Sequence, residues 1–381
     1  MLIQFSFPIA YVVFMGFRAS IILADDPITY KADTQGVLAV AVSADGKLIV
    51  AGGVSGKVGF WDVAKRKELV AIQASEEPIF VLELSPDGKQ LVTADENGVV
   101  LLWDVASHKK RAELRGHKGY VSGFSFSPDG KMLATSGYDG TVRIWSMKDL
   151  KSRELLRIRG KGFTDVAFSP DGRMLAAALF RGGVKLWKDG LAAEPVTIEA
   201  DGPRGRAANC LAFSPKGDRL AVTGYFYLQL FELPSGKLIH SAEIFGSRSK
   251  DQTIYSGEGL DIEFSPDGKL LAVAVRRSVQ TVIRPYFYGE ILIWDAKNFR
   301  QIRVLRGHTR PVRAIVFLPD GNTLISASLD GTTRLWSMNT EKGNRKGNRK
   351  RGHSTFPLRL RLHCRQSVAR RHSLFSRSCA R

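Results

Sequence analysis

A repeat of 42 residues governs what this chain can fold into. The tetrapeptide Ser-Pro-Asp-Gly, or a close variant, occurs seven times, at residues 43–46, 85–88, 127–130, 169–172, 214–217, 265–268 and 318–321. All six tryptophans keep one phase with it: Trp61, Trp103, Trp145 and Trp187 are each 42 residues apart, as are Trp294 and Trp336. Phe231 takes the tryptophan position of the fifth copy. One unit repeated seven times predicts a single repeat architecture rather than several independent domains.

Each copy predicts four short strands and leaves no room for a helix. In the third copy, apolar runs cover residues 121–126 and 131–137, and Pro-Asp-Gly between them predicts a tight turn, because proline fixes φ and glycine accepts positive φ. An alternating run at 141–145 ends in tryptophan, and a weaker run follows at 153–160. The unit is therefore expected to be a four-stranded antiparallel sheet. Such a sheet buries both of its faces only when several copies pack side by side.

Two dipeptides place this repeat in a known family. Trp-Asp stands at 61–62, 103–104 and 294–295, and Gly-His stands at 116–117 and 307–308. With the period and the tetrapeptide in register, residues 27–340 resemble the WD-repeat β-propellers. The resemblance implies an all-β, seven-bladed propeller of four-stranded antiparallel blades. The seventh copy ends near Met338 without a fourth strand, so the run at 28–32 is expected to complete the last blade.

The resemblance also implies a structural hydrogen-bond network in two blades. In the third copy the network would join His117, Asp139 and Trp145 through the hydroxyl of Thr135 or Ser136. In the seventh copy it would join His308, Asp330 and Trp336 through the hydroxyl of Ser326 or Ser328. A catalytic His–Asp–Ser set is the competing interpretation, and a buried structural network is preferred to it. Other copies hold Ser55, Asn97 or Arg181 at the aspartate position, so those blades are expected to depend on packing. The remaining tryptophans are predicted core residues: Trp61, Trp103, Trp187 and Trp294.

No pattern in the sequence indicates an enzyme, a metal site or a cofactor. The sequence has no Cys/His/Asp cluster with metal-ligand spacing, no phosphate-binding glycine loop and no GxSxG motif. The three cysteines, Cys210, Cys364 and Cys379, form neither a disulfide framework nor a zinc motif. The prediction is a non-catalytic scaffold that binds an unidentified protein or peptide, with the propeller as a monomer within a complex. A propeller enzyme with a group in the central channel is the weaker alternative.

Binding is assigned to three connections longer than the repeat requires, at 200–208, 246–258 and 276–290. In a WD propeller these connections open on one rim. Arginine and tyrosine dominate protein interfaces, and the predicted rim residues are Arg248, Tyr255, Arg276, Arg277, Arg284, Tyr286, Phe287 and Tyr288. The competing interpretation is a floppy insertion, or an extension of blade six that hides its own aromatic side chains.

The two ends of the chain are predicted to lie outside the propeller, which is assigned to residues 25–340. Residues 1–24 are apolar and resemble an export signal ending at Ala24, although Arg18 and Pro8 interrupt the run. The alternatives are an uncleaved membrane anchor or an upstream start, so the chain is predicted to be exported or membrane-tethered, or else cytoplasmic.

Residues 341–381 carry +12 of the net charge of +19. They are predicted to be a disordered basic tail, and polyanion binding by this tail, to nucleic acid or an anionic surface, is the alternative function. Binding of that kind weakens steeply with salt and requires the tail.

Overall fold

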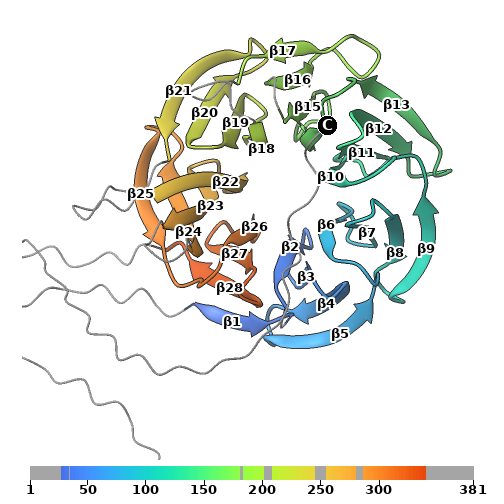
Figure 1. Cartoon of the computed structure of the whole chain (residues 1–381), viewed down its shortest axis with the longest axis vertical. Helices are drawn as coiled ribbons and strands as arrows, with labels where there is room; N and C mark the ends of the chain where they lie inside the picture. The colour runs from blue at the N-terminus through green and yellow to red at the C-terminus, as the bar shows by residue number, and fades with distance from the viewer. Residues whose placement is uncertain are drawn as a thin grey trace, which may run out of the picture. The chain divides into compact units, whose positions relative to one another are not determined.

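The computed structural model describes residues 27–339, apart from Thr34 and the segments 181–182, 201–207, 245–254 and 280–285. The described residues form 28 strands and no helix. They make seven four-stranded antiparallel sheets, which Figure 1 shows arranged as blades in a ring. The predicted seven-bladed β-propeller is confirmed. Residues 1–24 and 341–381 lie outside the described part of the chain, so what was expected of them stays a prediction.

The first four blades follow one another along the chain, each running from an inner strand to an outer strand. Blade 1 contains β2 (Val37–Val42), β3 (Leu48–Gly53), β4 (Lys57–Asp62) and β5 (Lys67–Gln73). Blade 2 contains β6 (Ile79–Leu84), β7 (Gln90–Asp95), β8 (Val100–Asp104) and β9 (Lys109–Leu114). Blade 3 contains β10 (Val121–Phe126), β11 (Met132–Gly137), β12 (Thr141–Ser146) and β13 (Ser152–Arg157). Blade 4 contains β14 (Phe163–Phe168), β15 (Leu175–Leu179), β16 (Val184–Trp187) and β17 (Val196–Ile198).

The last three blades include the one that closes the ring. Blade 5 contains β18 (Ala208–Phe213), β19 (Arg219–Gly224), β20 (Tyr227–Glu232) and β21 (Lys237–Glu243). Blade 6 contains β22 (Tyr255–Phe264), β23 (Leu270–Val279), β24 (Tyr286–Asp295) and β25 (Arg300–Leu305). Blade 7 contains β26 (Val312–Phe317), β27 (Thr323–Ser328) and β28 (Thr332–Ser337), and its outer strand is β1 (Ile28–Lys31). β1 pairs antiparallel with β28, with Tyr30 opposite Thr333.

The hydrophobic core lies between neighbouring blades rather than inside any one of them. Tyr30 and Ile325 of blade 7, for example, share a buried cluster with Ile49 and Trp61 of blade 1. All six tryptophans are buried, and so is Phe231 at the tryptophan position of blade 5. Because each cluster needs two blades, the fold is stable only as a complete ring.

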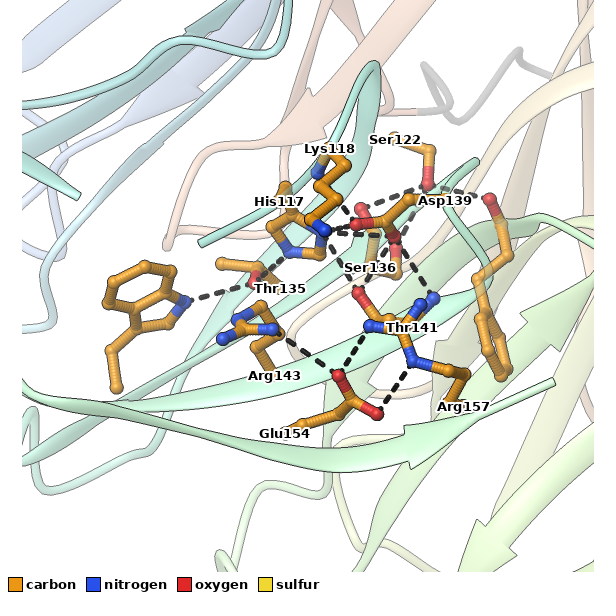
Figure 2. A network of polar contacts seen from close by, with 12 residues as sticks. His117, Lys118, Ser122, Thr135, Ser136, Asp139, Thr141, Arg143, Glu154 and Arg157 are labelled. Atoms are coloured by element: carbon orange, nitrogen blue, oxygen red, sulfur yellow. Dashed lines mark hydrogen bonds and ion pairs between the residues drawn. The ribbon is translucent and has the colours of Figure 1, made fainter. Parts of the chain in front are cut away.

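A hydrogen-bond network fixes the entry to blade 3 (Figure 2). Trp145 Nε1 donates to Thr135 Oγ1 at 3.0 Å, and the same hydroxyl lies 2.6 Å from His117 Nε2. The other ring nitrogen of His117 lies 3.2 Å from Asp139. The Nδ1–H tautomer of His117 satisfies every partner, because Nδ1 then donates to the carboxylate and Nε2 accepts from Thr135. Gly137 leaves room for this network, since a Cβ there would lie 2.7 Å from His117 Nδ1.

Blade 7 contains the same network with a serine in place of the threonine. His308 Nδ1 lies 2.8 Å from Asp330, and His308 Nε2 lies 2.7 Å from Ser326 Oγ. Trp336 Nε1 donates to that hydroxyl at 2.8 Å. Every polar atom at the centre of each network therefore has a partner within the protein, and the hydroxyls of Thr135 and Ser326 are fully buried, which is compatible with the predicted structural network.

Blades 1 and 2 each contain a polar contact between a carboxylate and a hydroxyl, which the repeat pattern did not predict. Ser55 Oγ donates to Asp33 Oδ2 at 2.5 Å in blade 1, and Ser75 Oγ donates to Asp95 Oδ2 at 2.8 Å in blade 2. Asp33 and Ser75 stand four residues before their inner strands, as His117 does before β10. The predicted dependence of these two blades on packing is thus supplemented by a polar pair. In blade 1 the carboxylate and the hydroxyl occupy the positions of the histidine and the aspartate, and in blade 2 the hydroxyl of Ser75 occupies the position of the histidine.

Candidate binding face at the channel mouth

The central channel encloses a cavity of about 320 Å³ to which all seven inner strands contribute. Each inner strand carries a β-bulge at the same position, which turns one extra side chain out of the ladder. The bulge residues, in blade order, are Leu38, Phe80, Ser122, Thr164, Asn209, Leu260 and Arg313, and all seven line the cavity.

Three of the bulge residues tie their blade to the next one. Each donates a side-chain hydrogen bond to a backbone carbonyl of the following blade. The bonds are Ser122 Oγ to Phe163 O (2.8 Å), Thr164 Oγ1 to Ala208 O (2.8 Å) and Asn209 Nδ2 to Gly259 O (3.0 Å). Polar side chains at this position thus hold the inner strands of blades 3 to 6 at a fixed spacing.

Further along the inner strands, acidic side chains make a second set of ties between blades. Each carboxyl accepts a backbone N–H of the next inner strand: Glu83 from Phe126 (3.1 Å), Asp165 from Leu211 (2.9 Å), Asp261 from Ile315 (2.7 Å) and Glu263 from Phe317 (2.7 Å). Enclosure by the ring desolvates these carboxyls and raises the pKa of Glu83 to about 7, of Asp165 to about 8 and of Asp261 to about 7. Burial also raises the pKa of Glu263 well above its usual range.

The stability of the propeller is therefore expected to fall as the pH rises through about 7 to 8. A carboxyl with a raised folded-state pKa contributes stability that is fully present below its unfolded pKa and is lost as the pH rises through the folded value. Thermal unfolding between about pH 5 and pH 8.5 should show a fall in Tm of about 5 °C or more. Asp165→Asn should reduce that slope, whereas Asp171→Asn, in an exposed turn, should not. A Tm that is independent of pH across this range would contradict the assignment.

Four aromatic side chains line one sector of the channel where it opens to solvent. We call Phe80, Tyr120, Tyr138 and Phe180 the aromatic arc. Successive ring centroids are 5.3, 5.1 and 6.4 Å apart. Tyr138 is 54% exposed and Phe180 is 42% exposed. Both lie in connections between the second and third strands of their blades, so the arc marks the face on which those connections open, here called the mouth face.

The sequence contained a signal for the arc that the sequence analysis missed. Tyr138 and Phe180 are 42 residues apart, and each directly follows the second strand of its copy. Tyr225 holds the same position in blade 5 and also lines the cavity. These three aromatic residues recur at the same turn of three consecutive copies, where they do not contribute to the core. Such a pattern indicates a binding surface.

The described parts of the insertion at 276–290 extend the strands of blade 6 on the same face. β22, β23 and β24 are each 10 residues long, and Arg276 pairs with Gly289 across the extended hairpin. Arg276 forms an ion pair with Glu258 and lies 5.2 Å from the ring centre of Phe287. Tyr286 is 53% exposed and Phe287 is 43% exposed. The described parts of the insertion, residues 276–279 and 286–290, therefore lengthen β23 and β24 and leave two aromatic side chains in solvent.

Arg277 lies inside this extension and is not offered to a partner. Its side chain is 4% exposed. Its Nε donates to Glu290 at 2.9 Å, and its Nη1 donates to the Ile244 carbonyl at 2.6 Å. Arg306 reaches the other oxygen of Glu290 at 2.7 Å. The expectation that Arg277 binds a partner is therefore corrected: antiparallel register turns neighbouring side chains to opposite faces, so Arg276 and Arg277 cannot both face the solvent.

The other predicted rim residues are only partly described. Tyr288 pairs with Arg277 across the hairpin, and its ring centre lies 6.2 Å from that of Tyr286. Tyr255 begins β22, but its side chain lies outside the description, as do Arg248 and Arg284 entirely. Within the described part of the chain, no group of three or more His, Cys, Asp or Glu side chains is arranged to hold a metal ion. No helix that could span a membrane occurs there either.

Comparison with known proteins agrees with this geometry. The family described as "WD domain, G-beta repeat" matches residues 27–62, 67–104, 108–146, 153–188 and 299–337. The chain is a WD-repeat protein. Each matched repeat begins on the outer strand of one blade and ends on the third strand of the next; residues 67–104, for example, run from β5 to β8. This offset explains why the first repeat supplies β1 to blade 7.

Curated relatives of this WD-repeat protein match it over short segments. A nuclear distribution protein of Aspergillus flavus is 41% identical over 51 residues, which are 13% of this chain and 11% of that protein. A COMPASS component of Saccharomyces cerevisiae is 32% identical over 81 residues, covering 20% and 16%. Human apoptotic protease-activating factor 1 is 26% identical over 130 residues, covering 33% and 9%. This chain spans between 3% and 18% of the length of the curated relatives that it matches.

Proposed function

We propose that this WD-repeat propeller is a non-catalytic scaffold that binds a segment of another protein across its mouth face. The observation that carries the proposal is a set of exposed aromatic side chains, Tyr138, Phe180, Tyr286 and Phe287, on the face where the channel cavity opens. WD-repeat propellers are typically scaffolds for protein interaction, and the name of the yeast relative describes it as a component of an assembly.

The chemistry of this face supports a protein partner. Tyrosine and arginine contribute most of the energy of many protein interfaces, because a large rigid ring loses little entropy when it is buried. Arg276 is held between Glu258 and Phe287, so its position on the hairpin is fixed before a partner arrives. Hydrogen bonds between the inner strands of blades 3, 4 and 5 fix the spacing of the blades that carry Tyr138 and Phe180.

The proposal predicts that loss of the exposed aromatics removes binding without unfolding the protein. We expect Tyr138→Ser with Phe180→Ser, and separately Tyr286→Ser with Phe287→Ser, to lower partner affinity about tenfold or more, since interface hot spots each contribute about 2 kcal/mol or more. Quantitative affinity purification from the source cells, followed by titration with the recovered partner, measures the effect.

Ile302→Ser is the matched control. Ile302 is 56% exposed on the outer strand β25, away from the mouth face, so its loss removes a similar apolar surface. The proposal requires the control to bind as the wild type does. Equal binding by the wild type and by both mouth-face pairs would show that the partner uses another surface.

A further inference from the structure

Arg313 differs from the other polar bulge residues in lacking an internal partner. Ser122, Thr164 and Asn209 each donate to the next blade, but Arg313 makes no hydrogen bond and no ion pair with any side chain or backbone group of the described residues. Its Nε is fully buried and has no acceptor. Arg313 also lines the cavity, so its charge has no partner among the described residues and is available to an anion that enters there.

Arg313 lines the same cavity as all four side chains of the aromatic arc. Its charge lowers the pKa of Tyr138 and of Asp261, in each case against a larger, opposite effect of burial. Tyr120, on the arc, is affected in the same way. Arg313 is thus within electrostatic reach of both the arc and the carboxyls of the inner strands.

The acidic groups near Arg313 are occupied by other partners. Asp261 accepts the N–H groups of Ile262 and Ile315, and Asp165 accepts those of Val166 and Leu211. Glu258 is paired with Arg276. Cys210 donates its thiol to the Leu260 carbonyl, and burial raises its pKa, so it carries no charge to offset the arginine. The positive charge of Arg313 is therefore not neutralised by these groups, and a ligand can pair with it.

We propose that Arg313 binds a carboxylate of the partner segment inside the channel, while apolar side chains of that segment pack on the aromatic arc. The carboxylate is an Asp or Glu side chain or the C-terminus of the partner. Arginine pairs with carboxylates through two parallel hydrogen bonds, which gives this group priority over other anions of a polypeptide. A cavity of about 320 Å³ admits a side chain or a chain end but no folded element. This inference rests on the proposed function.

The test uses short random peptides displayed with free C-termini and selected against the full chain. Peptides that bind the wild type should be enriched in Asp and Glu or should require their terminal carboxylate. A synthetic binder should lose affinity about tenfold or more when its acid is replaced by the amide, because hydrogen bonds to charged groups are worth about 1.5–3 kcal/mol. Amidation of the C-terminus alone distinguishes the two sources of the carboxylate.

Variants at Arg313 make the test specific. Arg313→Gln should bind the acid and the amide peptides equally, and Arg313→Lys should keep part of the preference for the acid. Thermal unfolding checks that both variants are folded. If either variant does not fold, Arg313→Met is used in its place. An unchanged acid preference in Arg313→Gln overturns the inference, as does selection of peptides without acid enrichment.

Loss of the proposed function gives a different result. If the selected peptides bind Tyr138→Ser with Phe180→Ser as tightly as the wild type, or if no peptide is selected, the mouth face is not the binding surface and the carboxylate site falls with it. If that variant loses binding while Arg313→Gln changes nothing, the mouth face stands and only the carboxylate site is overturned.

Discussion

Deletion of Ile28–Lys31 is expected to prevent the chain from folding into a stable monomer. These four residues form β1, the outer strand of blade 7, and their removal exposes the edge of β28. An exposed edge strand pairs with other chains, so aggregation is the expected consequence. The deletion also takes Tyr30 out of the cluster that joins blade 7 to blade 1. The ring then loses its closing contacts as well as one strand.

Point variants in β1 distinguish the contribution of ring closure from the effect of shortening the chain. Tyr30→Ala should lower the free energy of unfolding by about 3–5 kcal/mol, which corresponds to a fall in Tm of about 10 °C. Tyr30→Phe should leave the Tm unchanged or raise it, because the Tyr30 hydroxyl is buried without a hydrogen-bond partner. Thr29→Ala, at an exposed position of the same strand, is the control. Thermal unfolding and size-exclusion chromatography measure these effects, and a folded monomer after the deletion would contradict closure by β1.

Asp139→Ala is expected to cause the largest loss of stability among single substitutions in the polar networks. Asp139 faces His117 Nδ1 at 3.2 Å, and it accepts the Lys118 N–H (2.8 Å) and the Thr141 hydroxyl (2.7 Å). Removing one partner from a buried, charged network costs about 3–5 kcal/mol, because the donors that remain have no water to replace it. Urea unfolding at neutral pH measures this loss. Lys118→Ala, which keeps the backbone N–H, should cost almost nothing.

The same network gives a pH dependence of opposite sign to that of the channel carboxyls. Burial alone would raise the pKa of Asp139, but the hydrogen bonds from His117, Lys118 and Thr141 outweigh it and hold the pKa well below its usual range. A lowered folded-state pKa contributes stability that is present above the unfolded pKa, near 3.8, and is lost as the pH falls through the folded value. The difference between wild type and Asp139→Ala should therefore narrow below about pH 3. A difference that stays constant as the pH falls from about 4 to about 2 would contradict this role for the carboxylate.

The fold could be predicted from the sequence because one period fixed three features at once. The tetrapeptide set the first turn of each blade, the tryptophan set the third strand, and the absence of a fourth run after Met338 required the strand at residues 28–31. The partners of His117 and His308 followed from the family resemblance. The exchanged pair of Asp33 and Ser55 did not, because a carboxylate in place of the histidine and a hydroxyl in place of the aspartate leave no mark on the repeat pattern.

The binding face could be predicted only in part. Long connections pointed to blade 6, but length does not reveal that Arg277 turns inward to Glu290 while Arg276 stays on the surface. That distinction depends on the register of β23 against β24, which sequence periodicity cannot fix when the whole hairpin is longer than its repeat. Arg313 stayed hidden for a related reason. A bulge shifts one residue out of the alternation that would otherwise indicate which side chains enter the channel.

Hydrogen–deuterium exchange of the full chain, with and without its bound partner, tests the proposed binding face most directly. Binding across the mouth face predicts slower exchange in the backbone around Tyr120, Tyr138 and Phe180 and in the hairpin of β23 and β24. It predicts unchanged exchange in the Ser-Pro-Asp-Gly turns, which lie at the opposite ends of the inner strands. Slower exchange in those turns, with none around Tyr138 and Phe180, would contradict the proposed function.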